Sequence, residues 1–472
     1  MKMLTCSRLS SHFLGAFGRI TRRSVLLFCV GCFSAHAQEP NQVQKLPESI
    51  KSPVKWLQTS ELPEQAAAPD STKEKPGLVS TAINWFRKTD LPGDLQIHGF
   101  ASQAYIATSD NDVFGNSDKG GSFGLTETGL NASVRPLPRL QLSAQVLSRR
   151  AGEGNSGIPR LDYGFLDYRV YSHEVNQFGI RVGRLKNPFG FYNDTRDVPF
   201  TRPTIMLPQS IYFDRTRNVS LSGDSVQLYG ETAVSNWGTV STQFGVFLPI
   251  VSDKDTKLAL LGAQGPDGSL RPGHLQRDVS YIGRGIFETN DKRLRLGVSG
   301  IWLNTSYDPN SKLHDPLGPG ALQFSPIYFS AQYNAERWTL TSEYAIRHFK
   351  YNNNFNSSLN NQDFYGESYY FQGEYRFTPK WVGILRYDAL FTDRSDRDGS
   401  EFAKRTGGFA HSRFAKDITV GLRWNATPQF MLRAEYHHVN GTGWLSRLDN
   451  SVNEGPLSQH WDLYAIQASY RF

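Results

Sequence analysis

The 472-residue chain has only three cysteines, Cys6, Cys29 and Cys32, all close to its N-terminus. It also lacks any run of about 18 apolar residues, which excludes a helical membrane protein. The first 24 residues are basic and contain no acid. They are followed by the apolar run 25–33 and the small-residue site Ala35-His36-Ala37. This order predicts that residues 1–37 are a secretory signal peptide.

Removal of that signal would leave no cysteine, and it would leave 46 basic against 44 acidic residues, a net charge of +2. A chain without cysteine cannot form a disulfide scaffold, a Cys-ligated metal site or a Cys nucleophile. The near balance of charge also removes the argument for a nucleic-acid partner. We therefore expect no metal, no cofactor and no nucleic acid.

Aromatic residues and glycine are abundant instead, with 30 Phe, 21 Tyr, 9 Trp and 42 Gly. An exported, aromatic-rich chain that is polar on average is typical of an outer-membrane β-barrel, in which every second residue faces lipid. The competing class at this stage is an exported soluble all-β domain.

The segment 460–472 alternates between apolar and polar residues. Ile466, Tyr470 and Phe472 fall on one face, whereas Gln467 and Ser469 fall on the other. A period of two predicts a strand. A chain ending on such a strand with Phe is similar to bacterial outer-membrane proteins, so we interpret Tyr470 and Phe472 as an assembly signal for the barrel-assembly machinery.

The same alternation recurs along the chain and predicts a closed antiparallel transmembrane β-barrel over residues 94–472, with about 16 strands (alternatives 14 or 18). Seven short connections alternate with eight long polar ones, as expected for periplasmic turns and external loops. A barrel of this size encloses an aqueous channel. The sixteen predicted strands lie near 94–109, 121–137, 138–151, 159–173, 176–189, 224–237, 238–250, 277–289, 291–307, 322–336, 337–351, 365–379, 380–393, 413–427, 428–441 and 460–472.

The longest predicted connection is the third external loop, near 190–223. It is unusually apolar and contains several prolines, so we expect it to be stiff and to pack against a wall. Its aspartates and arginines either line a pore constriction or only neutralise one another. These residues are Asp194, Arg196, Asp197, Arg202, Asp214, Arg215 and Arg217.

Charged residues also fall on the strand face opposite the aromatic one, where they would form the pore wall. Arginine in a channel wall favours anions, because a guanidinium stays protonated and can hold a phosphate. Opposite charges two residues apart would weaken this preference, and any single arginine could instead be a salt-bridged wall residue. The predicted wall residues are Arg181, Arg284, Arg295, Arg376, Arg386, Arg423, Arg433, Glu374, Asp388 and Glu435.

The strand number, the terminal Phe and the long third loop resemble the bacterial outer-membrane porin superfamily. The stretch Gly183-Arg184-Leu185-Lys186-Asn187-Pro188-Phe189-Gly190 is similar to the phosphate-selective porin O/P-like group. This resemblance implies a third loop that folds into the channel and a homotrimer in the outer membrane, in contact with lipid and lipopolysaccharide. It also implies passive diffusion of small anions or hydrophilic solutes.

Residues 38–93 differ in composition from the rest, because most of them are polar or proline and few are large and apolar. We predict a periplasmic segment that is largely disordered. A short helix near 78–87 and a plain linker are equal alternatives for its end.

Two other functions remain open. A conduit for secretion of a polysaccharide or another anionic polymer would share the fold and the arginines. A remote alternative is a barrel-embedded esterase or phospholipase, because Gly223-Asp224-Ser225-Val226 resembles the nucleophile block of GDS-type esterases. The Asp-x-x-His partner of that family is absent from the sequence, and we expect no enzyme activity.

Overall fold

The computed structural model describes residues 95–472 except 263–268, 311, 312, 314, 316, 353–361 and 452–454. The predicted signal peptide, residues 1–37, and the predicted periplasmic segment, residues 38–93, lie outside the described residues. No helix in the described ranges is long and apolar enough to cross a membrane.

Sixteen long strands form the described fold, as the sequence predicts. Their boundaries agree with the expected ranges within a few residues. They are β1 (Gln96–Thr108), β2 (Ser122–Leu137), β3 (Leu140–Ala151), β5 (Arg160–His173), β6 (Asn176–Lys186), β7 (Ser222–Val234), β8 (Gly238–Pro249), β10 (Ser280–Thr289), β11 (Leu294–Asp308), β12 (Gly320–Asn334), β13 (Trp338–Tyr351), β14 (Asp363–Arg376), β15 (Trp381–Phe391), β16 (Phe414–Asn425), β17 (Phe430–Gly441) and β18 (His460–Arg471). The dipeptide strands β4 (Asn155–Ser156) and β9 (His274–Leu275) lie within long connections.

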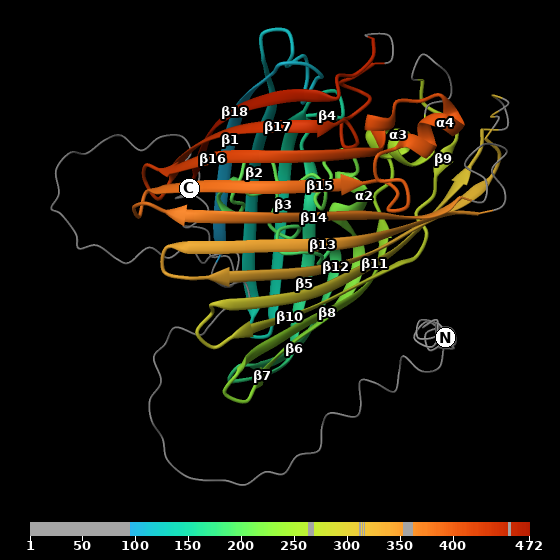
Figure 1. The fold of residues 1–472 in the computed structure, drawn as a ribbon. Helices are drawn as coiled ribbons and strands as arrows, with labels where there is room; N and C mark the ends of the chain where they lie inside the picture. Colours follow the sequence, from blue (N-terminus) through green and yellow to red (C-terminus); the bar gives the residue numbers. More distant parts are fainter. Residues whose placement is uncertain are drawn as a thin grey trace, which may run out of the picture. The chain divides into compact units, whose positions relative to one another are not determined.

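Each long strand pairs antiparallel with the next, and β18 pairs with β1 to close the barrel. In this seam Phe100 is opposite Arg471 and Thr108 is opposite Leu463. Figure 1 shows the first strands, in blue, next to the last, in red. Closure is physically required in a bilayer, because lipid offers no hydrogen-bond partner to a free strand edge.

The two faces of the wall differ as the alternation predicts. In β18, Tyr464, Ile466 and Tyr470 are at least half exposed, whereas Ala465 and Gln467 are buried. The exposed face carries large apolar side chains in almost every long strand. Because water does not favour such a surface, this belt faces the lipid and the opposite face lines the lumen.

Short helices occur only in long connections of the described chain. They are η2 (Pro199–Thr201) and α2 (Arg217–Leu221) between β6 and β7, α3 (Lys254–Leu261) between β8 and β10, and α4 (Ser400–Thr406) and η4 (Ala410–Arg413) between β15 and β16. Figure 1 shows α3 and α4 at one end of the barrel, away from the tight turns that join strand pairs. The predicted alternation of short turns and long loops is therefore present.

Both boundaries of the third loop differ by two or three residues from the predicted 190–223. The strand expected over 176–189 ends at Lys186, so the loop runs from Asn187 to Leu221. Pro188 explains the earlier end, because proline cannot donate the backbone hydrogen bond that a ladder needs.

Candidate functional site

The third loop, residues 187–221, enters the lumen and packs on the inner face of the wall. Phe189 and Tyr212 belong to a buried cluster with Tyr328 of β12 and Tyr370 of β14. The Phe189 ring stacks on Tyr328 with 4.9 Å between centroids. The expectation that this apolar loop needs a wall is met here, on the side formed by β8 and β10–β14.

The middle of the same loop packs on the other side of the barrel. Ile205 and Met206 lie in a cluster with Ala104 of β1, Val439 of β17 and Leu463 of β18. The two clusters therefore place the loop across the lumen, in contact with two different parts of the wall.

Glu343 of β13 anchors the beginning of the loop. Its buried carboxylate accepts hydrogen bonds from the Phe191 amide (2.9 Å), the Tyr212 hydroxyl (2.5 Å), Ser330 (2.5 Å) and Tyr370 (2.9 Å). The Tyr212 hydroxyl also accepts from the amides of Phe191 and Tyr192, at 2.9 and 3.0 Å. The carboxylate therefore accepts four hydrogen bonds, which offset the free-energy cost of burying its charge.

A glycine is required next to this anchor. Gly190 has a φ of +56°, and a Cβ there would lie 2.3 Å from the Tyr212 hydroxyl and 2.8 Å from the Glu343 carboxylate. This explains the last residue of the Gly183–Gly190 stretch in physical terms, because only glycine fits both the backbone angle and the space.

Two acidic residues of the predicted pore wall accept hydrogen bonds from backbone amides in the middle of the loop. Glu435 of β17 accepts from the amides of Ile205 and Met206, the latter at 3.3 Å, and Asp388 of β15 accepts from Ser210 at 3.2 Å. His437 sits beside Glu435 and bonds to Asp417 of β16 at 2.9 Å. These acids hold the loop to the wall.

Two predicted wall arginines bind the loop through its carbonyl groups. Arg386 donates to the Met206 carbonyl at 3.0 Å, and Arg433 donates to the carbonyls of Arg202 (3.0 Å) and Thr204 (2.8 Å). Both side chains are almost fully buried. The structure therefore places Arg386 and Arg433 against the loop backbone.

Glu127 of β2 forms a buried ion-pair network with the loop. It pairs with Arg202 of the loop and with Arg149 of β3, the latter at 3.2 Å. Arg149 also binds Asp214 at 2.7 Å, and Asp214 approaches Arg196 at 3.6 Å. A carboxylate and a guanidinium buried in this way stabilise the fold only as a pair.

The remaining loop charges also have partners. Asp197 pairs with Arg217 and with Lys186, and Lys186 reaches Asp162 of β5 at 2.5 Å. Arg215 stacks on Phe213 and donates to the Leu445 carbonyl at 3.4 Å. The interpretation that the loop charges neutralise one another therefore describes most of them, with wall residues joining the network.

Four other predicted wall arginines have partners other than the loop backbone. Arg181 pairs with Asp167 at 2.9 Å, and Arg423 pairs with Glu374 of a neighbouring part of the wall at 3.5 Å. Two others have neutral partners. Arg295 lies 4.6 Å from the Phe191 ring, and Arg376 donates to the carbonyls of Ala335 and Glu336, at 2.6 and 2.8 Å.

Arg284 of β10 belongs to the anchoring group instead. It binds Asp194 of the loop at 2.5 Å and donates to the Gly190 carbonyl at 3.2 Å. Together, these contacts connect the predicted wall residues Arg284, Arg386, Arg433, Asp388 and Glu435 to the third loop.

Sequence reasoning did not single out Glu127 and Lys186, and it gave Arg149 and Glu343 no role in attaching the loop. The alternation identifies the lumen face of Glu127, Arg149 and Glu343. It gives no signal that a residue 131 positions away, such as Tyr212 for Glu343, is the partner.

Phe472, predicted as part of an assembly signal, lies at the seam. Its backbone pairs with Gly99 through two hydrogen bonds of 3.0 and 3.1 Å. A Cβ on Gly99 would approach the Phe472 ring to 2.3 Å. Tyr470 points outward and is half exposed.

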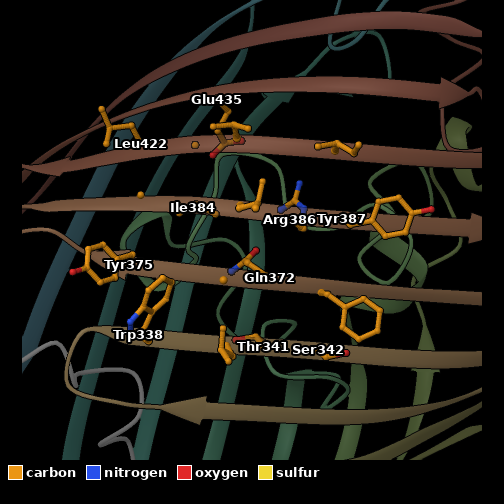
Figure 2. A pocket seen from close by; sticks show the side chains of 18 of the residues that line it. Trp338, Thr341, Ser342, Gln372, Tyr375, Ile384, Arg386, Tyr387, Leu422 and Glu435 are labelled. Carbon is orange, nitrogen blue, oxygen red and sulfur yellow. The ribbon is translucent and has the colours of Figure 1, made fainter.

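The outer face of β12–β18 has an apolar hollow of 1390 Å³, lined by lipid-facing residues such as Leu385, Leu422 and Ile466. Figure 2 shows its lining side chains, from Trp338 in β13 to Glu435 in β17. Gly373 and Gly383 are among its lining residues.

The esterase-like motif lies in a strand. Ser225 is the fourth residue of β7, and Asp224 pairs with Arg184 and Arg277 at 2.9 and 2.6 Å. Ser225 therefore does not occupy a strand-to-helix nucleophile turn of the type an esterase needs.

No protein-family model matches the chain, and no curated protein matches it. Solved structures are similar in fold. An anion-selective porin from Comamonas acidovorans has a TM-score of 0.51 and 11% identity, covering 80% of this chain and 100% of its own. The outer-membrane channel DcaP of Acinetobacter baumannii has a TM-score of 0.50 and 12% identity, covering 82% and 99%. OprB of Pseudomonas putida has a TM-score of 0.50 and 10% identity, covering 83% and 96%.

The fold is therefore that of outer-membrane porins. The chain is thus a porin-like barrel with an apolar outer belt of the kind that faces lipid. These structural similarities do not distinguish the phosphate-selective O/P-like group from other porins.

Proposed function

We propose that the chain is an outer-membrane porin, a water-filled channel for passive diffusion of small hydrophilic solutes with a moderate, phosphate-like anion preference. The observation that carries the proposal is the attachment of the third loop to two parts of the wall. A loop held in this way narrows the bore without opening the barrel, as a diffusion channel requires.

The anion preference rests on arginines whose partners are neutral. Arg295 lies against a phenylalanine ring and Arg376 against carbonyl groups, and neither has an ion pair within 4 Å among the described residues. Their positive charge is therefore not cancelled locally, and a wall of this sign favours anions.

We extend the proposal to the partners of the barrel. The lipid-facing belt contacts outer-membrane lipid and lipopolysaccharide, the last strand with Tyr470 and Phe472 is recognised by the barrel-assembly machinery, and three copies form a homotrimer. Residues 1–37 act as the export signal, and residues 38–93 stay in the periplasm. Mass measurement of the mature protein and crosslinking in the native membrane test these points.

Planar-bilayer recordings of the purified protein test the channel directly. We expect discrete openings in chloride, phosphate and sulfate, and a reversal potential on the anion side in a KCl gradient. A cation-side reversal potential would remove the arginine argument, and absence of conductance would remove the channel. A polysaccharide conduit predicts instead that swelling of protein-containing liposomes continues with long oligosaccharides, which the attached loop should exclude.

A further inference from the structure

A small cavity lies between the third loop and the external connections. Its volume is about 40 Å³, room for two or three water molecules or one small head group. Gln209 and Asn218 of the third loop line one side, and Asp112, Asp253 and Trp444 of three external connections line others. Arg149 and Arg215 of the loop network also line it, whereas the wall arginines Arg295 and Arg376 do not.

The lining is acidic. Five aspartates and two arginines line the cavity, an excess of three negative charges. One aspartate, Asp214, is neutralised by Arg149 at 2.7 Å. The other four have no ion pair within 4 Å in the part of the chain that the structure describes; they are Asp112, Asp253, Asp255 and Asp449.

These carboxylates are held in place by hydrogen bonds that leave their charge uncancelled. Asp253 caps α3 by accepting from the Thr256 amide at 2.8 Å, Asp255 accepts from Ser446 at 2.6 Å, and Asp449 accepts from the Glu153 amide at 2.8 Å. Burial, with the neighbouring carboxylates as a further cause, raises the pKa of Asp255 and of Asp449 to about 6.

Buried polar atoms without partners line the same cavity. Asn218 and Trp444 are more than nine-tenths buried, yet the Asn218 Oδ1 and the Trp444 Nε1 have no hydrogen-bond partner. The Asp253 Oδ2 is also without one. Buried polar atoms are nearly always satisfied, so the two unpartnered acceptor oxygens, the Asn218 Oδ1 and the Asp253 Oδ2, indicate a bound hydrogen-bond donor.

The chemistry of the lining selects the species. Carboxylate and amide oxygens accept hydrogen bonds from a cationic nitrogen, and an indole face attracts such a group through its π electrons. No three acidic, histidine or cysteine side chains in the described ranges come close enough to hold one metal ion. We propose that this cavity binds the cationic head group, an ammonium or guanidinium, of a small organic solute at the outer side of the third loop.

Calorimetry on the folded full-length protein in detergent tests the proposal without relying on a channel. The probe is agmatine, which carries an ammonium and a guanidinium, with glucose and calcium chloride titrated separately. We expect saturable agmatine binding, which the double substitution Asp253→Asn and Asp255→Asn weakens at least tenfold. Asparagine preserves the accepted hydrogen bonds, so the loss reports charge.

Glu401→Gln is the matched control, because Glu401 lies exposed on α4, and it should bind agmatine as the unmodified protein does. Trp444→Phe is a second variant, expected to weaken binding while keeping an aromatic ring in the cavity. Equal agmatine affinity in all variants, no saturable binding, or saturation by calcium or glucose alone would overturn the proposal. Since binding is measured at equilibrium, these outcomes are independent of whether the protein conducts.

Discussion

The hydroxyl of Tyr212 in the third loop donates a 2.5 Å hydrogen bond to the buried carboxylate of Glu343 in β13. The same hydroxyl accepts two loop amides, so one side chain joins the loop backbone to the wall. This phenol oxygen and its carboxylate partner are therefore one of the attachments that hold the loop in the lumen.

Replacement of that oxygen should loosen the loop. Tyr212→Phe leaves the Tyr192 amide and part of the Glu343 carboxylate without partners, at a cost of about 1–3 kcal/mol in the free energy of unfolding. We expect noisier and larger single-channel currents. Tyr464→Phe, which removes a hydroxyl from the lipid-facing side, is the control. Identical currents and stability in the two variants would show that the loop is held elsewhere.

Breaking the buried pair of Glu127 and Arg202 should destabilise the barrel strongly. Glu127→Gln leaves the guanidinium of Arg202 buried without its carboxylate, which costs about 3–5 kcal/mol. Adding Arg202→Met to this variant should recover part of the loss, because the unpaired charge is then gone. Urea unfolding followed by tryptophan fluorescence measures both variants. A double variant that is less stable than Glu127→Gln alone would contradict this explanation.

Ion selectivity should depend on arginines with neutral partners. The double substitution Arg295→Gln and Arg376→Gln should move the reversal potential in a KCl gradient toward the cation side. Arg293→Gln, in an exposed turn next to Asp291, should leave it unchanged. If the exposed turn substitution shifts the potential as much as the double substitution, surface charge rather than the lumen sets selectivity.

Acidification should lower the affinity of the acidic cavity for a cation. The raised pKa of Asp255 and Asp449, about 6, means that the folded state takes up protons more readily than the unfolded chain. Their contribution to stability is therefore full below pH about 4 and is lost as the pH rises through 6. Four other charged residues face these two carboxyl groups and also influence their pKa values. They are Asp112, Asp253, Glu153 and Arg215.

We accordingly expect agmatine affinity to fall, and resistance of the outer loops to proteolysis to rise, between pH 8 and 5. The double substitution Asp255→Asn and Asp449→Asn should flatten both profiles. Profiles that keep their shape in this variant would assign the titration to other groups.

The seam should tolerate no side chain at Gly99. Gly99→Ala places a methyl group against the Phe472 ring, whereas Gly285→Ala in β10 places it in open space. We expect a lower yield of folded, heat-modifiable barrel from Gly99→Ala only. Equal yields would mean that the Phe472 ring moves aside freely.

The sequence was sufficient to predict the barrel, because a period of two with short and long connections is a local pattern that each strand repeats. Strand β18, from His460 to Arg471, even showed which side chains face lipid. The same pattern could not predict what lies opposite a lumen residue. Arg386 and Glu435 have the expected face, yet they contact Met206, about two hundred residues earlier in the chain. Only the path of the third loop determines those partners.

The β1–β18 seam has a consequence for the order of events in the cell. Its pairs join residues about 370 positions apart, such as Phe100 and Arg471, so the first strand stays without its second neighbour until the last one is present. Before that point a partly formed sheet has a free strand edge, a state prone to aggregation in water. Closure of the β1–β18 seam therefore removes the last exposed strand edge, and it can occur only after the whole barrel sequence is present.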